Sequence, residues 1–174
     1  EPGTTQPAPS SLPGSQSRPG SPTVAVVATT PETAVADMGR AMDLAGISQF
    51  LSPEIKTFLK VNISWQHWYP ACSTTPWQIE GVTKALEALG HKDLVAAHNG
   101  TVVVNSYEGE LKNKHKAAQL KVGLSDIHLD SEPNGWIDYK PKAEMLVLED
   151  IFPEGIQIPE SFPGTNIVHL PTMK

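Results

Sequence analysis

Six polar side chains stand where predicted apolar strands end or where a helix begins: Lys60, Asn62, Thr74, Thr75, His98 and Asn99. Ligands of open α/β sheets bind outside the carboxyl ends of the strands. An ammonium group, an imidazole, amides and hydroxyls donate hydrogen bonds, which suits a carboxylate or a phosphate. We therefore expect a small anionic ligand at this edge. The structural alternative is that Thr75 only caps a helix and that Lys60 only reaches solvent.

The same strand-end rule selects a second, weaker set of polar residues, namely Thr29, Thr30, Ser64, His128, Asp130, Thr172 and Lys174. Cys72, the single cysteine, lies just before the helix that Thr75 and Pro76 begin. The positive end of a helix dipole lowers the pKa of a nearby thiol, so Cys72 is a candidate reactive thiol. Catalysis would need His67 or His98 within reach as a base, and an inert loop cysteine is the alternative.

Metal binding is another chemistry that the residue types allow. The candidate ligands are His67, Cys72, His98, His128, Asp130 and His169. None of them forms a close pair at a recognised metal-ligand spacing, so we predict no metal site and expect histidines scattered over surface and loops. The sequence also contains no P-loop, nucleophile elbow or dinucleotide-binding motif.

Four aromatic residues, Trp65, Trp68, Tyr69 and Trp77, lie within a predicted loop at 65–77. They could stack on a ligand, pack the loop onto the sheet, or contact a second domain or protein. The last possibility gives an alternative function for the chain. It would be a tethered, non-catalytic interaction module that uses this loop.

Three apolar runs in the first hundred residues predict buried strands, at 24–28, 55–63 and 94–97. The segments between them predict helices, the first from Thr29 or Thr30 to Gly46 and the second from Thr75 to Gly90. Strands that alternate with helices indicate a parallel sheet with right-handed crossovers. We therefore predict an α/β fold, a mostly parallel sheet with flanking helices in Rossmann-like layers.

The pattern becomes less regular beyond residue 100. It predicts a strand at 102–104, a polar helix at 112–122, and strands at 124–129, 145–148, 155–158 and 166–170. The chain stops directly after the last of these, where a crossover would follow. We therefore expect residues 23–174 to be a single, incomplete α/β domain from a longer protein.

Composition limits the partners of the chain. Residues 1–22 hold six of the 16 prolines and predict a disordered linker, which favours an exported or membrane-tethered protein. The net charge of −6 argues against nucleic acid as a partner. No apolar run approaches the ~20 residues that cross a bilayer. One cysteine cannot form an internal disulfide or hold an iron–sulfur cluster.

The order of motifs resembles the domain of unknown function 362 family. The corresponding segments are Lys60-Val61-Asn62, Ser73-Thr74-Thr75-Pro76, Ala97-His98-Asn99-Gly100 and Leu170-Pro171-Thr172-Met173-Lys174. The resemblance covers residues 23–174 and implies that the domain continues past its last strand. Many members of the family are joined to ferredoxin-like segments, which implies redox work. An iron–sulfur cluster would then have to be supplied by a region outside this chain.

The chain departs from the family pattern at several positions. Val61 replaces a proline, and the histidine expected before Pro76 is absent. His98 or Asn99 stands where an acidic residue is expected, and Thr172 stands where a lysine is usual. These differences fall at the predicted site, so the resemblance informs the fold more than the chemistry.

Overall fold

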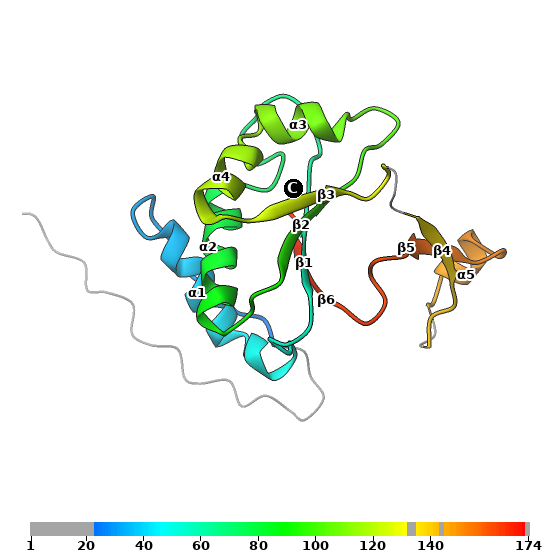
Figure 1. The fold of residues 1–174 in the computed structure, drawn as a ribbon, viewed down its shortest axis with the longest axis horizontal. Helices are drawn as coiled ribbons and strands as arrows, with labels where there is room; N and C mark the ends of the chain where they lie inside the picture. Colours follow the sequence, from blue (N-terminus) through cyan, green and yellow to red (C-terminus); the bar gives the residue numbers. More distant parts are fainter. Residues whose placement is uncertain (1–22, 132–134, 143–144, 173–174) are drawn as a thin grey trace, which may run out of the picture.

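A four-stranded parallel sheet forms the centre of the fold. The structure, a computed structural model, describes residues 23–131, 135–142 and 145–172, so the predicted linker at 1–22 and Lys174 lie outside the described residues. The strands are β1 (Thr57–Val61), β2 (Leu94–His98), β3 (Ser125–His128) and β6 (Asn166–Leu170), in the order β3-β2-β1-β6. The predicted α/β fold with a parallel sheet is confirmed (Figure 1).

One face of this sheet packs against helices. These are α1 (Ala34–Leu44), α2 (Pro76–Ala88) and α4 (His115–Val122), which Figure 1 shows on one side of the strands. Leu59 and Val61 of β1 and Ala96 of β2 meet Ile79 and Leu86 of α2 in the larger hydrophobic core. Burial of these aliphatic side chains, each contributing about 1.5–3 kcal/mol, is the main stabilisation of the layer.

Helices α1 and α2 approach each other closely at Gly81. A Cβ added at this glycine would lie 2.4 Å from the backbone oxygen of Val35 and 2.7 Å from the side chain of Met38. Only a residue without a side chain lets α1 approach this near. The contact fixes α1 against the helix that begins at the predicted site.

The opposite face of the sheet carries a smaller core. Phe58, Val95, Ala97 and Leu129 are buried there, and the ring centroid of Phe162 lies 5.2 Å from that of Phe58. Towards β6 this face is open, because Ile167 keeps 44% of its surface exposed. The sheet therefore has one face covered by helices and one that is only partly covered by other segments of the chain.

The predicted start of α2 is confirmed. Thr75 is the N-cap residue, its side chain accepts a hydrogen bond from the backbone N–H of Gln78 at 3.3 Å, and Pro76 occupies the first turn. Gly46 and Gly90 follow the ends of α1 and α2 with positive φ angles of 71° and 95°, as helix-ending glycines do.

Several predicted elements are wrong. Residues 24–28 form no strand, and Val24 and Val26 are exposed. An apolar run becomes a strand only where it pairs with another strand, and residues 24–28 pair with none of the described strands. Residues 102–104 form a loop in which Thr101 N–H donates to Val104 O at 3.0 Å.

The predicted helix at 112–122 corresponds to α4, and the structure adds a further helix directly before it. Helix α3 (Ser106–Lys112) and α4 are separated at Lys114, whose positive φ of 63° breaks the helical path. The predicted strand at 145–148 is wrong as well, since a turn there leads into the short helix α5 (Leu148–Ile151).

The C-terminal half is less regular, as predicted. Strands β4 (Trp136–Tyr139) and β5 (Ile156–Pro159) form a separate antiparallel pair, which Figure 1 shows together with α5 beside the main sheet. A 3-10 turn, η1 (Ile47–Gln49), follows α1. None of the helices in the described residues is long and apolar enough to cross a membrane.

Candidate functional site

The sheet divides the predicted ligand-binding residues between its two faces. Lys60 pairs in register with Ala97, which belongs to the partly open face, and Asn62 and Asn99 lie two residues further along each chain. His98 belongs to the opposite face, because side chains alternate along a strand. The six residues therefore all lie at the carboxyl ends of the strands, but they do not form one site.

Thr74 has a structural role at this end of the sheet. It is buried, its backbone N–H donates to Asn62 O at 2.9 Å, and its hydroxyl accepts from Asn62 N–H at 2.9 Å. The same hydroxyl donates to Leu170 O at 2.5 Å. Thr74 thus joins the ends of β1 and β6, and Thr75 caps α2.

Lys60 is the charged group of the predicted set. Its side chain is half-buried and its ammonium group donates to the backbone oxygen of Val61 at 3.2 Å. Burial lowers the pKa of Lys60 below its ordinary value of 10.5. Within the described residues no carboxylate forms an ion pair with this ammonium group. Lys60 therefore carries a positive charge that no acidic side chain here compensates.

The amides near Lys60 have partly open hydrogen-bonding capacity. Asn62 Oδ1 accepts from Ser64 Oγ at 2.8 Å, and Asn99 Nδ2 donates to Gly100 O at 3.1 Å. Amide groups have two donor hydrogens each, so Asn62 and Asn99 can still donate to an anion.

Cys72 lies in the aromatic loop, partly exposed. Its backbone N–H donates to Tyr69 O at 3.3 Å. In the described part of the chain, neither His67 nor His98 hydrogen-bonds to its thiol, and the ring of His67 lies 5.5 Å from that of Trp65.

The helix-covered face holds a mostly buried group of polar side chains that we call the β2–β3 polar cluster. Its members are His98, Glu110, His115, Lys116, Gln119, Asp126 and His128. They come from the carboxyl ends of β2 and β3 and from α3 and α4. The prediction of scattered histidines is therefore wrong for His98 and His128, which are register partners with ring centroids 5.3 Å apart. His67 and His169 are exposed, as that prediction expected.

Glu110 lies between the two histidines. One carboxylate oxygen, Oε1, lies 3.8 Å from His98 Nε2, and the other, Oε2, lies 3.4 Å from His128 Nε2. Burial raises the pKa of Glu110, and the Asp126 carboxylate raises it further. Lys116 offsets this negative charge, since its ammonium group contacts Asp126 and lies 3.7 Å from Glu110 Oε1.

Two histidines of the cluster, His98 and His115, are held in the neutral form. Burial, with the neighbouring charges of His115 and His128, lowers the pKa of His98 to about 3. The side-chain amide of Gln119 donates to His98 Nε2 at 2.9 Å, which requires an unprotonated Nε2. Burial also lowers the pKa of His115, whose Nε2–H donates to Thr74 O at 2.6 Å.

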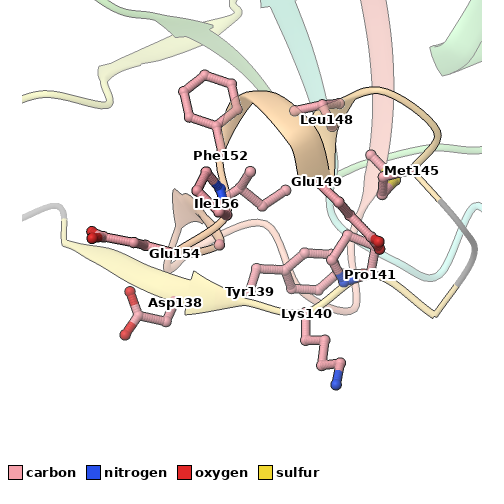
Figure 2. Close-up of a pocket in the computed structure, with 12 residues that line it drawn as sticks. Asp138, Tyr139, Lys140, Pro141, Met145, Leu148, Glu149, Phe152, Glu154 and Ile156 are labelled. Atoms are coloured by element: carbon pink, nitrogen blue, oxygen red, sulfur yellow. The ribbon is translucent and has the colours of Figure 1, made fainter.

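Of the surface hollows, one lies beside these elements and another lies apart from them. One of about 440 Å³ opens at the carboxyl ends of β2 and β3, where Ser106, Tyr107 and Asp130 are among its lining residues. The other, of about 600 Å³, lies between β4, β5 and α5 (Figure 2). Figure 2 shows Tyr139, Leu148 and Phe152 around it. None of the predicted site residues lines this second hollow.

Neither a protein-family model, nor a curated protein, nor a solved structure matches this chain. The resemblance to the domain of unknown function 362 family therefore stays a prediction.

Sequence reasoning missed Glu110 and Asp126. Asp126 precedes His128 by two residues on a strand, a spacing that places both side chains on one face and that could have been noticed. Glu110 carried no comparable signal, because its place in the cluster depends on how α3 returns to the sheet.

Proposed function

We propose that this domain binds a small anionic ligand at the carboxyl end of β1, as part of a larger enzyme or redox protein. The observation that carries the proposal is Lys60, a half-buried ammonium group without an acidic partner among the described residues. Partly buried charges are normally paired, because leaving water disfavours the charged form. A bound carboxylate or phosphate would supply the missing negative charge.

The position of Lys60 supports the same proposal. From β1 the chain continues to β2 and β3 on one side of the sheet, whereas β6 pairs with β1 on the other side. The strand order therefore reverses at β1. Such a point is where open α/β sheets bind ligands. The register partner of Lys60 on β6 is His169, which is exposed and adds a hydrogen-bonding group on the same face.

The experiment is a binding titration of the purified chain with inorganic phosphate, sulfate, acetate and citrate. Binding is detected by thermal shift and by calorimetry. Replacing Lys60 with methionine keeps the length of the side chain and removes its charge. A charged hydrogen bond contributes about 1.5–3 kcal/mol, so Lys60→Met should weaken binding roughly ten- to a hundredfold.

Lys56 offers a matched control at the other end of the same strand face. Its ammonium group lies 3.9 Å from Asp93 Oδ1 and 5.4 Å from the ring centroid of Phe58. Lys56→Met should leave anion binding unchanged. Equal anion affinity in the wild type and Lys60→Met would overturn the proposal.

The exposed aromatic loop favours a second candidate function, a contact with another domain or protein. Trp65, Trp68 and Trp77 each keep over 40% of their surface exposed, and Tyr69 keeps 68%. Aromatic side chains of this kind dominate binding energy at protein interfaces. Because Lys114 lies over the Trp68 ring at 4.9 Å, that ring is held in place before any partner arrives.

A role in redox chemistry rests on the family resemblance. The single cysteine means that an iron–sulfur cluster would be held by residues outside this chain, with the anion site described above contributing substrate binding. Expression of the chain with any cysteine-rich continuation of its gene, followed by absorption spectroscopy after anaerobic reconstitution, tests this role. A colourless product after reconstitution would argue against it.

A further inference from the structure

The β2–β3 polar cluster presents a set of metal-ligand atoms. Single ligand atoms of His98, Glu110 and Asp126 all lie within 4.8 Å of one another. His128 Nε2 faces the same carboxylates, 3.4 Å from Glu110 Oε2 and 3.8 Å from Asp126 Oδ2. We propose that His98, Glu110 and Asp126 bind one divalent transition-metal ion, with His128 as a candidate fourth ligand, at a site separate from Lys60.

A buried oxygen without a hydrogen bond also points to such a ligand. Glu110 Oε1 is buried and accepts no hydrogen bond from any described residue. Buried polar atoms of this kind are normally hydrogen-bonded, so an exception needs an explanation. This oxygen lies 3.8 Å from His98 Nε2, and therefore faces the middle of the proposed ligand set.

The donor types fit first-row transition metals. Imidazole nitrogens combined with carboxylate oxygens bind Zn²⁺, Mn²⁺, Fe²⁺ and Co²⁺. Ligand atoms around zinc stand about 2.0–2.2 Å from the ion, and so roughly 3.3 Å from each other. The separations of 3.4–3.8 Å between Glu110 and the two histidines need only small side-chain movements to reach this geometry.

The charge balance favours displacement of the Lys116 ammonium group by a metal ion. Glu110 and Asp126 together carry two negative charges, and the single positive charge of Lys116 leaves one uncompensated. A divalent ion would neutralise both carboxylates. The Lys116 side chain is 38% exposed, so its ammonium group can turn towards solvent when the ion enters.

Neighbouring residues already orient His128 for this role. Ser106 Oγ hydrogen-bonds to His128 Nδ1 at 2.9 Å, and the Tyr107 ring stacks on the imidazole with centroids 3.7 Å apart. Fixing one ring nitrogen of a histidine directs the other towards a metal. On the His98 side, the Gln119 amide bonds to Nε2 and would be released on metal binding.

Cobalt provides the direct test, because Co²⁺ bound by nitrogen and oxygen ligands absorbs visible light. The full chain is treated with a chelator, dialysed and titrated with Co²⁺, Zn²⁺ or Mn²⁺. Binding is measured by visible absorption for Co²⁺ and by calorimetry for all three ions. We expect one ion per chain. Glu110→Gln and Asp126→Asn should each weaken binding at least tenfold, while Lys116→Met, which removes the competing ammonium, should strengthen it at least tenfold.

A surface histidine gives the control. His67→Gln changes an exposed imidazole outside the cluster and should leave the affinity and the cobalt spectrum unchanged. Absence of stoichiometric binding in both the wild type and Lys116→Met would overturn the proposal. The proposal would also be overturned if Lys116→Met and the wild type had equal metal affinity while His67→Gln had a lower one. Because Lys116→Met removes a partly exposed side chain and predicts a gain, unfolding cannot imitate the expected result.

Discussion

The hydroxyl group of Thr74 donates a hydrogen bond to the backbone oxygen of Leu170 at 2.5 Å and accepts one from the backbone N–H of Asn62 at 2.9 Å. One side chain thereby joins β1 to β6, the strand farthest from it in sequence. This bond holds the edge at which Lys60 lies, so the shape of the proposed anion site depends on Thr74 even without direct contact.

Replacement of Thr74 should therefore destabilise the fold. Thr74→Val keeps the shape but leaves Leu170 O and Asn62 N–H without their partner, and each unsatisfied buried group costs about 1–3 kcal/mol. We expect Thr74→Val to lower the free energy of unfolding by about 2–4 kcal/mol in urea titrations. Thr74→Ser retains the hydroxyl and should lose less than about 1.5 kcal/mol. Equal stability of Thr74→Val and the wild type would contradict the structural role.

The contact between α1 and α2 gives a second prediction. Gly81→Ala places a methyl group 2.4 Å from the backbone oxygen of Val35, so α1 must move away, and we expect a loss of about 1–3 kcal/mol in unfolding free energy. Gly39→Ala on α1 is the matched control, since its added Cβ meets Ala85 at 3.4 Å, close to ordinary contact. A helical alanine there should be neutral or stabilising by up to about 1 kcal/mol. The idea fails if Gly81→Ala is as stable as Gly39→Ala.

Stability should fall in mild acid. Burial lowers the pKa of His115 below 6.5, so just below pH 6.5 the unfolded chain takes up a proton that the folded chain does not. The contribution of neutral His115 to the free energy of unfolding is complete above pH 6.5. It is lost as the pH falls towards the pKa of His115 in the folded chain. The free energy of unfolding in chelator-treated protein should drop by about 1.4 kcal/mol per pH unit for this group.

A glutamine variant isolates the titration of His115. His115→Gln keeps a donor for Thr74 O but removes the ionisable ring, so its stability should depend less on pH between 6.5 and 5 than that of the wild type. His67→Gln, at an exposed position, serves as the control. Parallel pH curves for His115→Gln and the wild type would show that His115 is not held neutral by the fold.

Local signals predicted the elements that surround the proposed anion site. The Thr75-Pro76 pair specified the start of α2, and the apolar runs specified β1 and β2, because capping and burial act over a few residues. The run at 24–28 forms no strand because a strand also needs a pairing partner, which no local pattern encodes. Glu110 and His98 meet only because the fold brings one side chain of α3 to the end of β2, so their contact could not be predicted from spacing.

The most direct test of the anion site is the pKa of Lys60, measured by NMR of the chain with ¹³C-labelled lysine side chains. Burial places this pKa below its ordinary value of 10.5 in the free protein. A bound anion favours the charged ammonium, so saturating phosphate or citrate should raise the Lys60 pKa while that of Lys56 stays unchanged. A Lys60 pKa that no anion in the panel raises would contradict the proposed site.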